Sequence, residues 1–267
     1  NSFSYCRFSN MFQIIESSSA GNCAFLQYDG INILVDAGVG VRRISAYLAS
    51  IGLEIGDIDA VFITHEHSDH CKALKNFTKY SGIKVFANRL TAESIRYLMP
   101  ETKTLNWQIF ETGSSFDFYG ISVAPFSIPH DTSDAVGYCF GCGNRNLVWM
   151  TDLGKVTLAA RDVASRANVL VLESNYCPVL LDNSSRPYSL KMRIKSSHGH
   201  LSNADAIELM AALDASKVEK IFLAHISKEC NNMDHIRELL ESSGRLSAIL
   251  NKIEIVSPFS KRSSVFE

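Results

Sequence analysis

Three histidines and an aspartate stand within six positions of the chain, in the stretch THEHSDHCK that covers residues 64–72. The four residues are His65, His67, Asp69 and His70. Neutral histidine is the commonest metal ligand in proteins, and imidazole together with carboxylate suits zinc, manganese or iron. Without a metal, these polar groups would crowd one another with little apolar burial to offset them. The spacing H-x-H-x-D-H therefore predicts a metal site.

Residues of the same types follow other apolar runs. The run AVFIT is followed by His65, VAPFSIP by His130, LVWMT by Asp152 and IFLA by His225. A lone histidine or aspartate after a strand is usually a turn or capping residue, and Asp36 in LVDAG is open to the same interpretation. However, α/β sheets place their sites where loops from several strand ends converge. The recurrence therefore predicts that these side chains meet.

The elements that must position these residues alternate along the chain. Apolar, β-branched runs of strand length recur, and Asp29-Gly30 between the runs 23–28 and 31–35 predicts a hairpin turn. Helical periodicity is predicted over residues 41–51, 72–80, 91–99, 156–164, 203–213 and 233–242. Early hairpins followed by mixed strands and helices predict an α/β protein in which helices cover two stacked sheets.

The composition is that of an ordinary globular protein, with 267 residues of which 46% are apolar and 20% charged. We expect residues 11–267 to form a single domain. Residues 1–10 are predicted to be a leader of uncertain origin, because Met11 or an upstream residue would be the natural start. No apolar run approaches the roughly 18 residues of a membrane span, so no membrane association is predicted.

Cysteine usage indicates the compartment. The seven cysteines are an odd number and widely scattered, which favours free thiols in a reducing, cytoplasmic environment over a disulfide scaffold. Cys139 and Cys142 form a C-x-x-C pair with no second pair near it, so buried structural thiols are favoured over a zinc knuckle.

One segment is basic in a chain whose net charge is −2. Residues 183–204 contain no aspartate or glutamate and carry four cations, Arg186, Lys191, Arg193 and Lys195. The net charge argues against a globally basic surface for nucleic acid, whereas this local segment could contact backbone phosphates and make binding salt-dependent. The alternative is a solvated helix face, because Leu190 and Ile194 have i, i+4 spacing.

The H-x-H-x-D-H motif, read with His130, Asp152 and His225, resembles the metallo-β-lactamase superfamily over nearly the whole chain. The resemblance implies an α/β fold, the four-layer αββα sandwich, with two divalent metal ions (zinc or manganese, with iron also compatible) between the ends of the sheets. It implies that the first ion is held by His65, His67 and His130, and the second by Asp69, His70 and His225, with Asp152 bridging both. It also implies that Asp36 supports the ligands from behind.

Single residues and short motifs indicate which branch of the superfamily the chain resembles. Aspartate at position 152, where two-zinc β-lactamases carry cysteine, argues against antibiotic hydrolysis, and His67 in place of glutamate argues against the di-iron flavoproteins. The motifs SSSAGNC, PHD, TDLG, ESN, GHLSN and AHISKECNN are together similar to the YycJ/WalJ (VicX) group of 5′-to-3′ DNA exonucleases. The chain departs from that group in having Tyr176 and Cys177, where members commonly have His-Asp after ESN.

Two metal ions lower the pKa of a shared water and clamp the attacking and leaving oxygens of an in-line displacement. We therefore expect a hydroxide that bridges the ions as nucleophile, oriented by Asp69 and Asp152, with Asp69 able to accept its proton. His200 in GHLSN matches the catalytic histidine that nuclease branches keep near this point, and would protonate the leaving alkoxide. Ser202 and Asn203 are predicted to cap the helix that follows, whose N-terminus is itself an anion site.

The function predicted is that of a dinuclear phosphodiesterase, a 5′-to-3′ exonuclease on duplex DNA. The preference for DNA and for the 5′ end rests on the resemblance alone. A metallohydrolase of a small-molecule ester, thioester or cyclic phosphate is the rival, and its activity would be indifferent to the basic segment. Nothing in the sequence identifies a protein partner.

Overall fold

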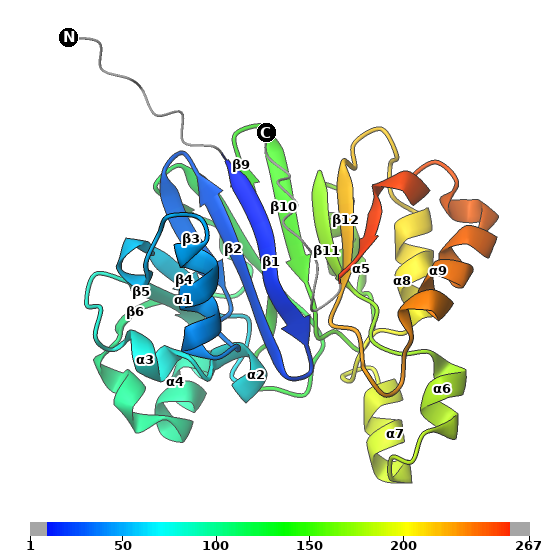
Figure 1. Cartoon of the computed structure of the whole chain (residues 1–267), viewed down its shortest axis with the longest axis horizontal. Helices are drawn as coiled ribbons and strands as arrows, with labels where there is room; N and C mark the ends of the chain where they lie inside the picture. The colour runs from blue at the N-terminus through cyan, green and yellow to red at the C-terminus, as the bar shows by residue number, and fades with distance from the viewer. Residues whose placement is uncertain (1–9, 257–267) are drawn as a thin grey trace.

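The computed structural model describes residues 10–256, and two β-sheets face each other within this range (Figure 1). The first sheet has the order β1 (Met11–Ser18), β2 (Gly21–Tyr28), β3 (Ile31–Val35), β4 (Ala60–Phe62), β5 (Lys84–Asn88), β6 (Asn106–Phe110). The second has the order β13 (Ile253–Ile255), β12 (Lys220–Ala224), β11 (Val169–Glu173), β10 (Arg145–Met150), β9 (Val136–Cys142), β8 (Ile121–Ser127), β7 (Phe116–Phe118). The predicted leader lies outside the described residues, apart from Asn10.

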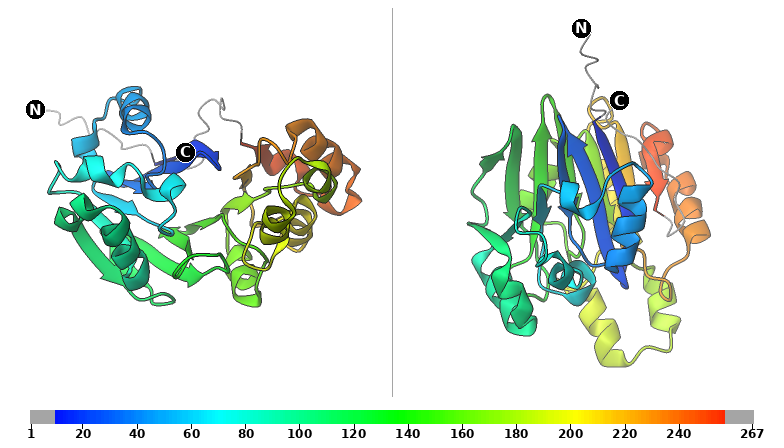
Figure 2. Two further views of the ribbon diagram at one scale, coloured as in Figure 1. Left: turned by 90° about the horizontal axis from the view of Figure 1, so that it is seen from below. Right: turned by 60° about the vertical axis from the view of Figure 1, so that its left-hand side comes forward.

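Helices cover the outer face of each sheet, as the two views of Figure 2 also show. On the first sheet these are α1 (Val41–Ala49), α3 (Leu74–Phe77) and α4 (Arg89–Leu98). On the second they are α5 (Leu158–Ala164), α8 (Asn203–Ala211) and α9 (Met233–Ser242). The short α2 (Ser68–Cys71), α6 (Pro178–Asn183) and α7 (Tyr188–Lys195) lie at one end, and single 3-10 turns cover Ile55–Asp57, Pro100–Thr104, Gly244–Leu246 and Leu250–Lys252. The predicted αββα sandwich is confirmed.

The central strands β4, β11 and β12 are apolar along nearly their whole length because both of their faces are buried. In β11, Val169 and Val171 point into the layer between the sheets, whereas Leu170 and Leu172 point toward the helices. The same alternation places Phe62 between the sheets, in contact with Phe86 and Tyr138, and Val61 against the helices. Continuous apolar runs rather than alternating ones are therefore what this architecture requires.

Most predicted elements are confirmed, with ends that shift by a few residues. The Asp29-Gly30 hairpin is present, and both residues have positive φ, 49° and 83°, as a two-residue turn between twisted strands requires. The single helix predicted over residues 72–80 is wrong. The Ala73 amide donates to Ala37 O at 2.9 Å rather than to its own helix, so the chain forms α2 and α3 instead.

Hydrogen bonds join the two sheets at the end of the sandwich where α2 lies. Tyr138 Oη of β9 donates to Ile63 O at 2.6 Å, and the Val136 amide donates to Thr64 O at 3.1 Å. On the other side of the same end, the His225 amide donates to Ser17 Oγ at 2.9 Å. These bonds hold the ends of β4 and β12 in one place.

All six cysteines among the described residues are free, including Cys139 and Cys142. No helix within residues 10–256 has the length and apolar character needed to cross a membrane.

Candidate metal centre

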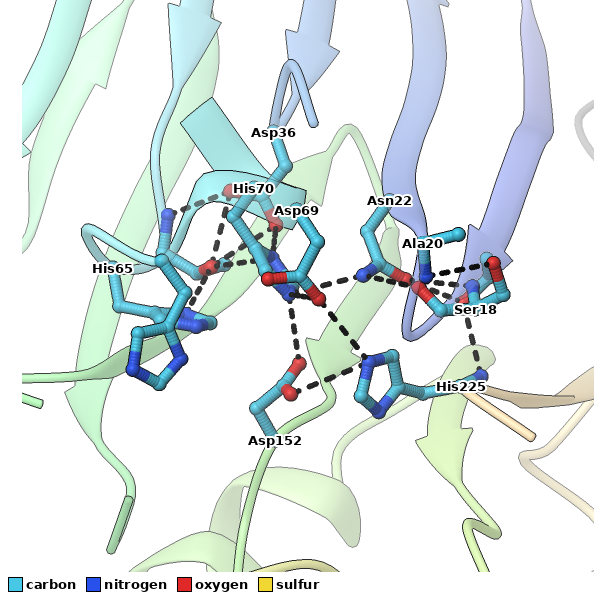
Figure 3. A network of polar contacts seen from close by, with 12 residues as sticks. Ser18, Ala20, Asn22, Asp36, His65, Asp69, His70, Asp152 and His225 are labelled. Atoms are coloured by element: carbon cyan, nitrogen blue, oxygen red, sulfur yellow. Dashed lines mark hydrogen bonds and ion pairs between the residues drawn. The ribbon is translucent and has the colours of Figure 1, made fainter. Parts of the chain in front are cut away.

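All seven predicted metal ligands meet at the end of the sandwich, on the segments that follow four different strands, β4, β8, β10 and β12. The donor atoms of His65, His67 and His130 lie within 4.8 Å of one another, and so do those of Asp69, His70 and His225. A third such set contains His65, His70 and Asp152. Figure 3 shows Asp152 between His70 and His225, with its carboxylate 3.2 Å from His70 Nε2 and 3.4 Å from His225 Nε2.

The unsatisfied atoms of the cluster fit divalent cations. Nε2 of His65, His130 and His225 and Oδ2 of Asp152 are buried and have no hydrogen-bond partner among the described residues. Burial lowers the pKa of His65 and of His130, so both rings are neutral and keep a lone pair. Buried polar atoms without a partner are costly, and metal ligation is a way in which proteins satisfy them.

The ring nitrogens on the far side of three histidines are held by buried acceptors. His70 Nδ1 lies 2.8 Å from Asp36 Oδ2, His130 Nδ1 lies 3.1 Å from Gly199 O, and His225 Nδ1 lies 2.8 Å from Glu173 Oε1. An acceptor at Nδ1 fixes the tautomer and turns Nε2 toward the centre. Asp36 is itself fully buried and accepts a hydrogen bond from the Thr64 amide at 2.9 Å.

Burial alone would raise the pKa of Asp152, but His225 and His70 outweigh it and hold that pKa well below its ordinary value. The site is therefore an ionised carboxylate surrounded by imidazoles.

The backbone is strained at three of these positions. Asp36, Asp152 and His225 have φ of 60°, 61° and 53°, in the left-handed region that non-glycine residues seldom adopt. Each follows a strand directly or within two residues, so the unusual turn aims its side chain across the end of the sheets. Strain of this kind persists where the surrounding structure over-determines it, and it clusters at functional sites.

Glu173 is a residue of this centre that the sequence interpretation overlooked. Its side chain is fully buried, and Oε1 lies 2.8 Å from both His200 Nδ1 and His225 Nδ1. Oε2 accepts the amides of Leu153 at 3.0 Å and Leu201 at 3.1 Å. A signal was present, because VLVLE ends a fully apolar strand with a charged residue, as AVFIT-His65 does.

The proton balance of His200 depends on Glu173. Burial lowers the pKa of His200, but the Glu173 carboxylate outweighs this effect and raises that pKa above its ordinary value. Burial raises the pKa of Glu173, but His200 and His225 together outweigh burial and lower that pKa, so the glutamate stays ionised. His200 is thus a histidine that keeps its proton beside the ligand cluster.

A cleft opens over the cluster, and the basic segment supplies one of its walls. Arg186 and Arg193 line this cleft together with Leu190 and Ile194 of α7, as do His67, Asp69 and His200.

The other four predicted substrate contacts are not brought to the cleft. Lys191 Nζ donates to Asp182 O and Ser184 O, both at 2.7 Å, and Lys195 forms an ion pair with Asp182. Ser202 caps α8 as predicted, accepting the Asp205 amide at 3.2 Å, but it is buried. Asn203 is also buried, where its side chain binds Ser174 and Asn231.

Gly38 allows α2 to lie against the turn after β3. A Cβ on this residue would be 1.5 Å from Asp69 O and 2.5 Å from the His70 nitrogen, both of which are backbone atoms. We expect Gly38→Ala to displace Asp69 and His70, to lower the free energy of unfolding by about 3 kcal/mol and to reduce the metal content. Denaturant unfolding and metal analysis of the purified protein would measure both.

Gly40→Ala is the matched control for this prediction, because nothing lies within 4 Å of a Cβ built there. If Gly38→Ala had the same stability and metal content as Gly40→Ala, the close approach at Gly38 would not be what positions the ligands.

Comparison with known proteins agrees with this geometry. The family profile of the Beta-lactamase superfamily domain matches residues 31–226. The exodeoxyribonuclease YycJ of Bacillus anthracis is 34% identical over 238 residues, covering 87% of this chain and 90% of that protein. The exodeoxyribonuclease WalJ of Streptococcus pneumoniae R6 is 34% identical over 223 residues, covering 82% of each.

Solved structures with low sequence identity share the fold. The metallo-β-lactamase fold protein YhfI from Bacillus subtilis superposes with a TM-score of 0.70 at 14% identity, covering 93% of this chain and 97% of that one. Zn²⁺-bound PqqB from Methylobacterium extorquens gives 0.71 at 15% identity, covering 95% and 99%.

Proposed function

The chain belongs to the metallo-β-lactamase superfamily and to its YycJ/WalJ group, and from this premise we propose that it is a two-metal exonuclease that degrades duplex DNA from the 5′ end. That it is a metal-dependent hydrolase follows from the family itself. The observation that carries the proposal is the pair of three-ligand sets joined by Asp152. Deoxyribonucleic acid is the substrate in the names of both relatives. The 5′-to-3′ direction is part of the proposal and rests on the resemblance of the sequence motifs to this group.

The residues present would hold two ions of zinc or manganese, with iron also suited to the donor set. His65, His67 and His130 would hold one, Asp69, His70 and His225 the other, and Asp152 would contact both. When bound, the ions would supply Lewis acidity to the phosphoryl oxygens and lower the pKa of the attacking water.

The protein's own groups would do the rest of the work. Interaction with His225 and His70 overcomes the effect of burial and lowers the pKa of Asp69, so this carboxylate is ionised and can orient the water by accepting its hydrogen bonds. His200 lines the cleft, and the Glu173 carboxylate at its Nδ1 keeps the ring protonated, so that the other ring nitrogen, Nε2, would give a proton to the leaving oxygen. Arg193 and Arg186 would bind the non-bridging oxygens.

We also infer that the protein works in the cytoplasm. Its six described cysteines are free, and thiols persist in reducing compartments. Lys191, Lys195, Ser202 and Asn203 do not line the cleft, so we assign them to holding α6, α7 and α8 in place.

The proposal predicts the course of digestion of a linear duplex with Mn²⁺ or Zn²⁺ added. A label on a 5′ end should appear at once in the smallest product, whereas a label on a 3′ end should pass through a ladder of shortening strands. Gel analysis of both substrates in parallel would measure this, with a chelator as control. A metal-loaded protein that leaves DNA intact but hydrolyses small esters, thioesters or cyclic phosphates would contradict it.

A further inference from the structure

The two arginines that line the cleft are each already paired with a carboxylate from a different loop. Arg193 of α7 forms an ion pair and hydrogen bond through Nε with Asp131 Oδ2. Arg186, which precedes α7, donates from Nε to Glu229 Oε2 at 3.0 Å. Asp131 lies on the loop after β8, and Glu229 lies on the loop after β12. The two ion pairs therefore connect α7 and the residue Arg186 before it to two loops that also carry metal ligands.

Asp131 lies beside the metal ligands themselves. Its Oδ1 is 3.5 Å from His130 Nε2 and 4.0 Å from His67 Nε2, and its side chain lines the cleft. An anion that enters this part of the cleft must therefore share the space with the Asp131 carboxylate and compete with it for Arg193.

The lysines of the same segment are arranged differently. Lys191 and Lys195 both bind Asp182 at the end of α6, and neither lines the cleft. The four cations of residues 183–204 thus divide into two lysines that fasten α7 to α6 and two arginines that line the cleft. The sequence alone shows no acid in this segment, and the three acids that pair with its cations come from outside it or from its border.

The arginine pairs are suited to exchange. Each pair has one exposed partner, Arg193 at 60% and Glu229 at 47%, and one less exposed partner, Asp131 at 28% and Arg186 at 26%. Solvent therefore reaches both pairs and weakens them, so that they can open. A phosphodiester offers guanidinium two charge-assisted hydrogen bonds in a matching plane, which is a stronger interaction than a screened carboxylate gives.

We propose that Asp131 and Glu229 are exchangeable counter-ions, which hold Arg193 and Arg186 in the cleft and release them to substrate phosphates. The pairs determine specificity, because a ligand must displace two carboxylates to gain both arginines. A polyanionic backbone brings several negative charges to the exchange, whereas a small monoanionic ester brings one charge against two carboxylates. This inference rests on the proposed function in taking a nucleic-acid backbone as the occupant.

Binding of a blocked duplex tests the inference on the full-length, metal-loaded protein. The probe is a blunt duplex with phosphorothioate linkages at its ends, labelled with a fluorophore, and the readout is Kd from fluorescence anisotropy. We expect Asp131→Asn and Glu229→Gln each to tighten binding by about threefold to fivefold, because each removes a competing anion. The gain in affinity from Asp131→Asn should vanish in the double variant that also carries Arg193→Ala. The gain in affinity from Glu229→Gln should likewise vanish in the double variant that also carries Arg186→Ala.

Asp182→Asn is the matched control, since it removes the same charge from an ion pair at the same helix but outside the cleft. Its Kd should stay within about twofold of wild type. The exchange mechanism would be wrong if Asp131→Asn and Glu229→Gln bound the duplex no more tightly than Asp182→Asn. It would also be wrong if their tighter binding persisted after the paired arginine was replaced. Either result would leave the nuclease proposal standing. Failure of the wild type to bind the duplex at all would overturn both.

Discussion

Asp152→Ala is expected to lower DNA turnover by about 10³-fold or more, since even the outer partners of metal ligands are worth about 10- to 100-fold. Its carboxylate lies 3.2 Å from His70 Nε2, 3.4 Å from His225 Nε2 and 3.9 Å from His130 Nε2, so it contacts ligands of both three-residue sets. The neighbouring acids each lie beside one set, Asp69 near His70 and His225 and Asp131 near His130 and His67. Steady-state turnover, together with the number of metal ions per chain, would measure the loss.

The control for this change is Asp162→Ala, which removes an exposed aspartate of α5 that forms an ion pair with Arg166. Asp162→Ala should keep both its turnover and its metal. If Asp152→Ala retained two ions per chain and wild-type turnover, the assignment of Asp152 as the shared ligand would be wrong.

Glu173→Gln is expected to lower kcat by roughly 10²- to 10³-fold, the range in which a positioned proton donor acts. Each carboxylate oxygen accepts two hydrogen bonds, so a glutamine must turn its NH₂ group toward two N–H donors. The resulting mismatch should also cost about 1–3 kcal/mol of stability. Rapid-quench turnover and denaturant unfolding would separate the two effects.

The dependence of kcat on pH distinguishes a role through His200 from a general loss of structure. Glu173 raises the pKa of His200, and the protonated ring is the donor, so wild-type kcat falls as the pH rises through that pKa. Without the carboxylate, the fall should begin at lower pH. Glu208→Gln, an exposed glutamate of α8, should show the wild-type profile. If the pH profile of Glu173→Gln matched those of the wild type and of Glu208→Gln, the proposed effect of Glu173 on His200 would be ruled out.

The ligand cluster was predictable because its signal is local. H-x-H-x-D-H is a contiguous motif, and His130, Asp152 and His225 each follow an apolar run whose strand character is evident from a few residues. The two layers of helices and the hairpin at Asp29-Gly30 were predictable for the same reason. Periodicity and turn chemistry depend on neighbours in the chain.

What escaped prediction depends on contacts between distant residues. The break between α2 and α3 arises from a hydrogen bond to Ala37, more than thirty residues away. The basic segment looked uncompensated because Asp131 and Glu229 approach it only in the folded protein. Lys191 and Lys195 cannot be told from Arg186 and Arg193 by charge, since only the path of α6 and α7 decides which side chains face the cleft.

The hydrogen bonds that join the two sheets at the ligand cluster have a consequence for how the protein matures. The first three-ligand set needs His130, and the second is incomplete until His225, which follows the strand β12 near the end of the described chain. A nascent chain leaving the ribosome can therefore complete neither set until long after the H-x-H-x-D-H motif has emerged. The full metal complement can therefore be acquired only after His225 has emerged, and a stalled or truncated polypeptide that ends before His225 would lack the second set.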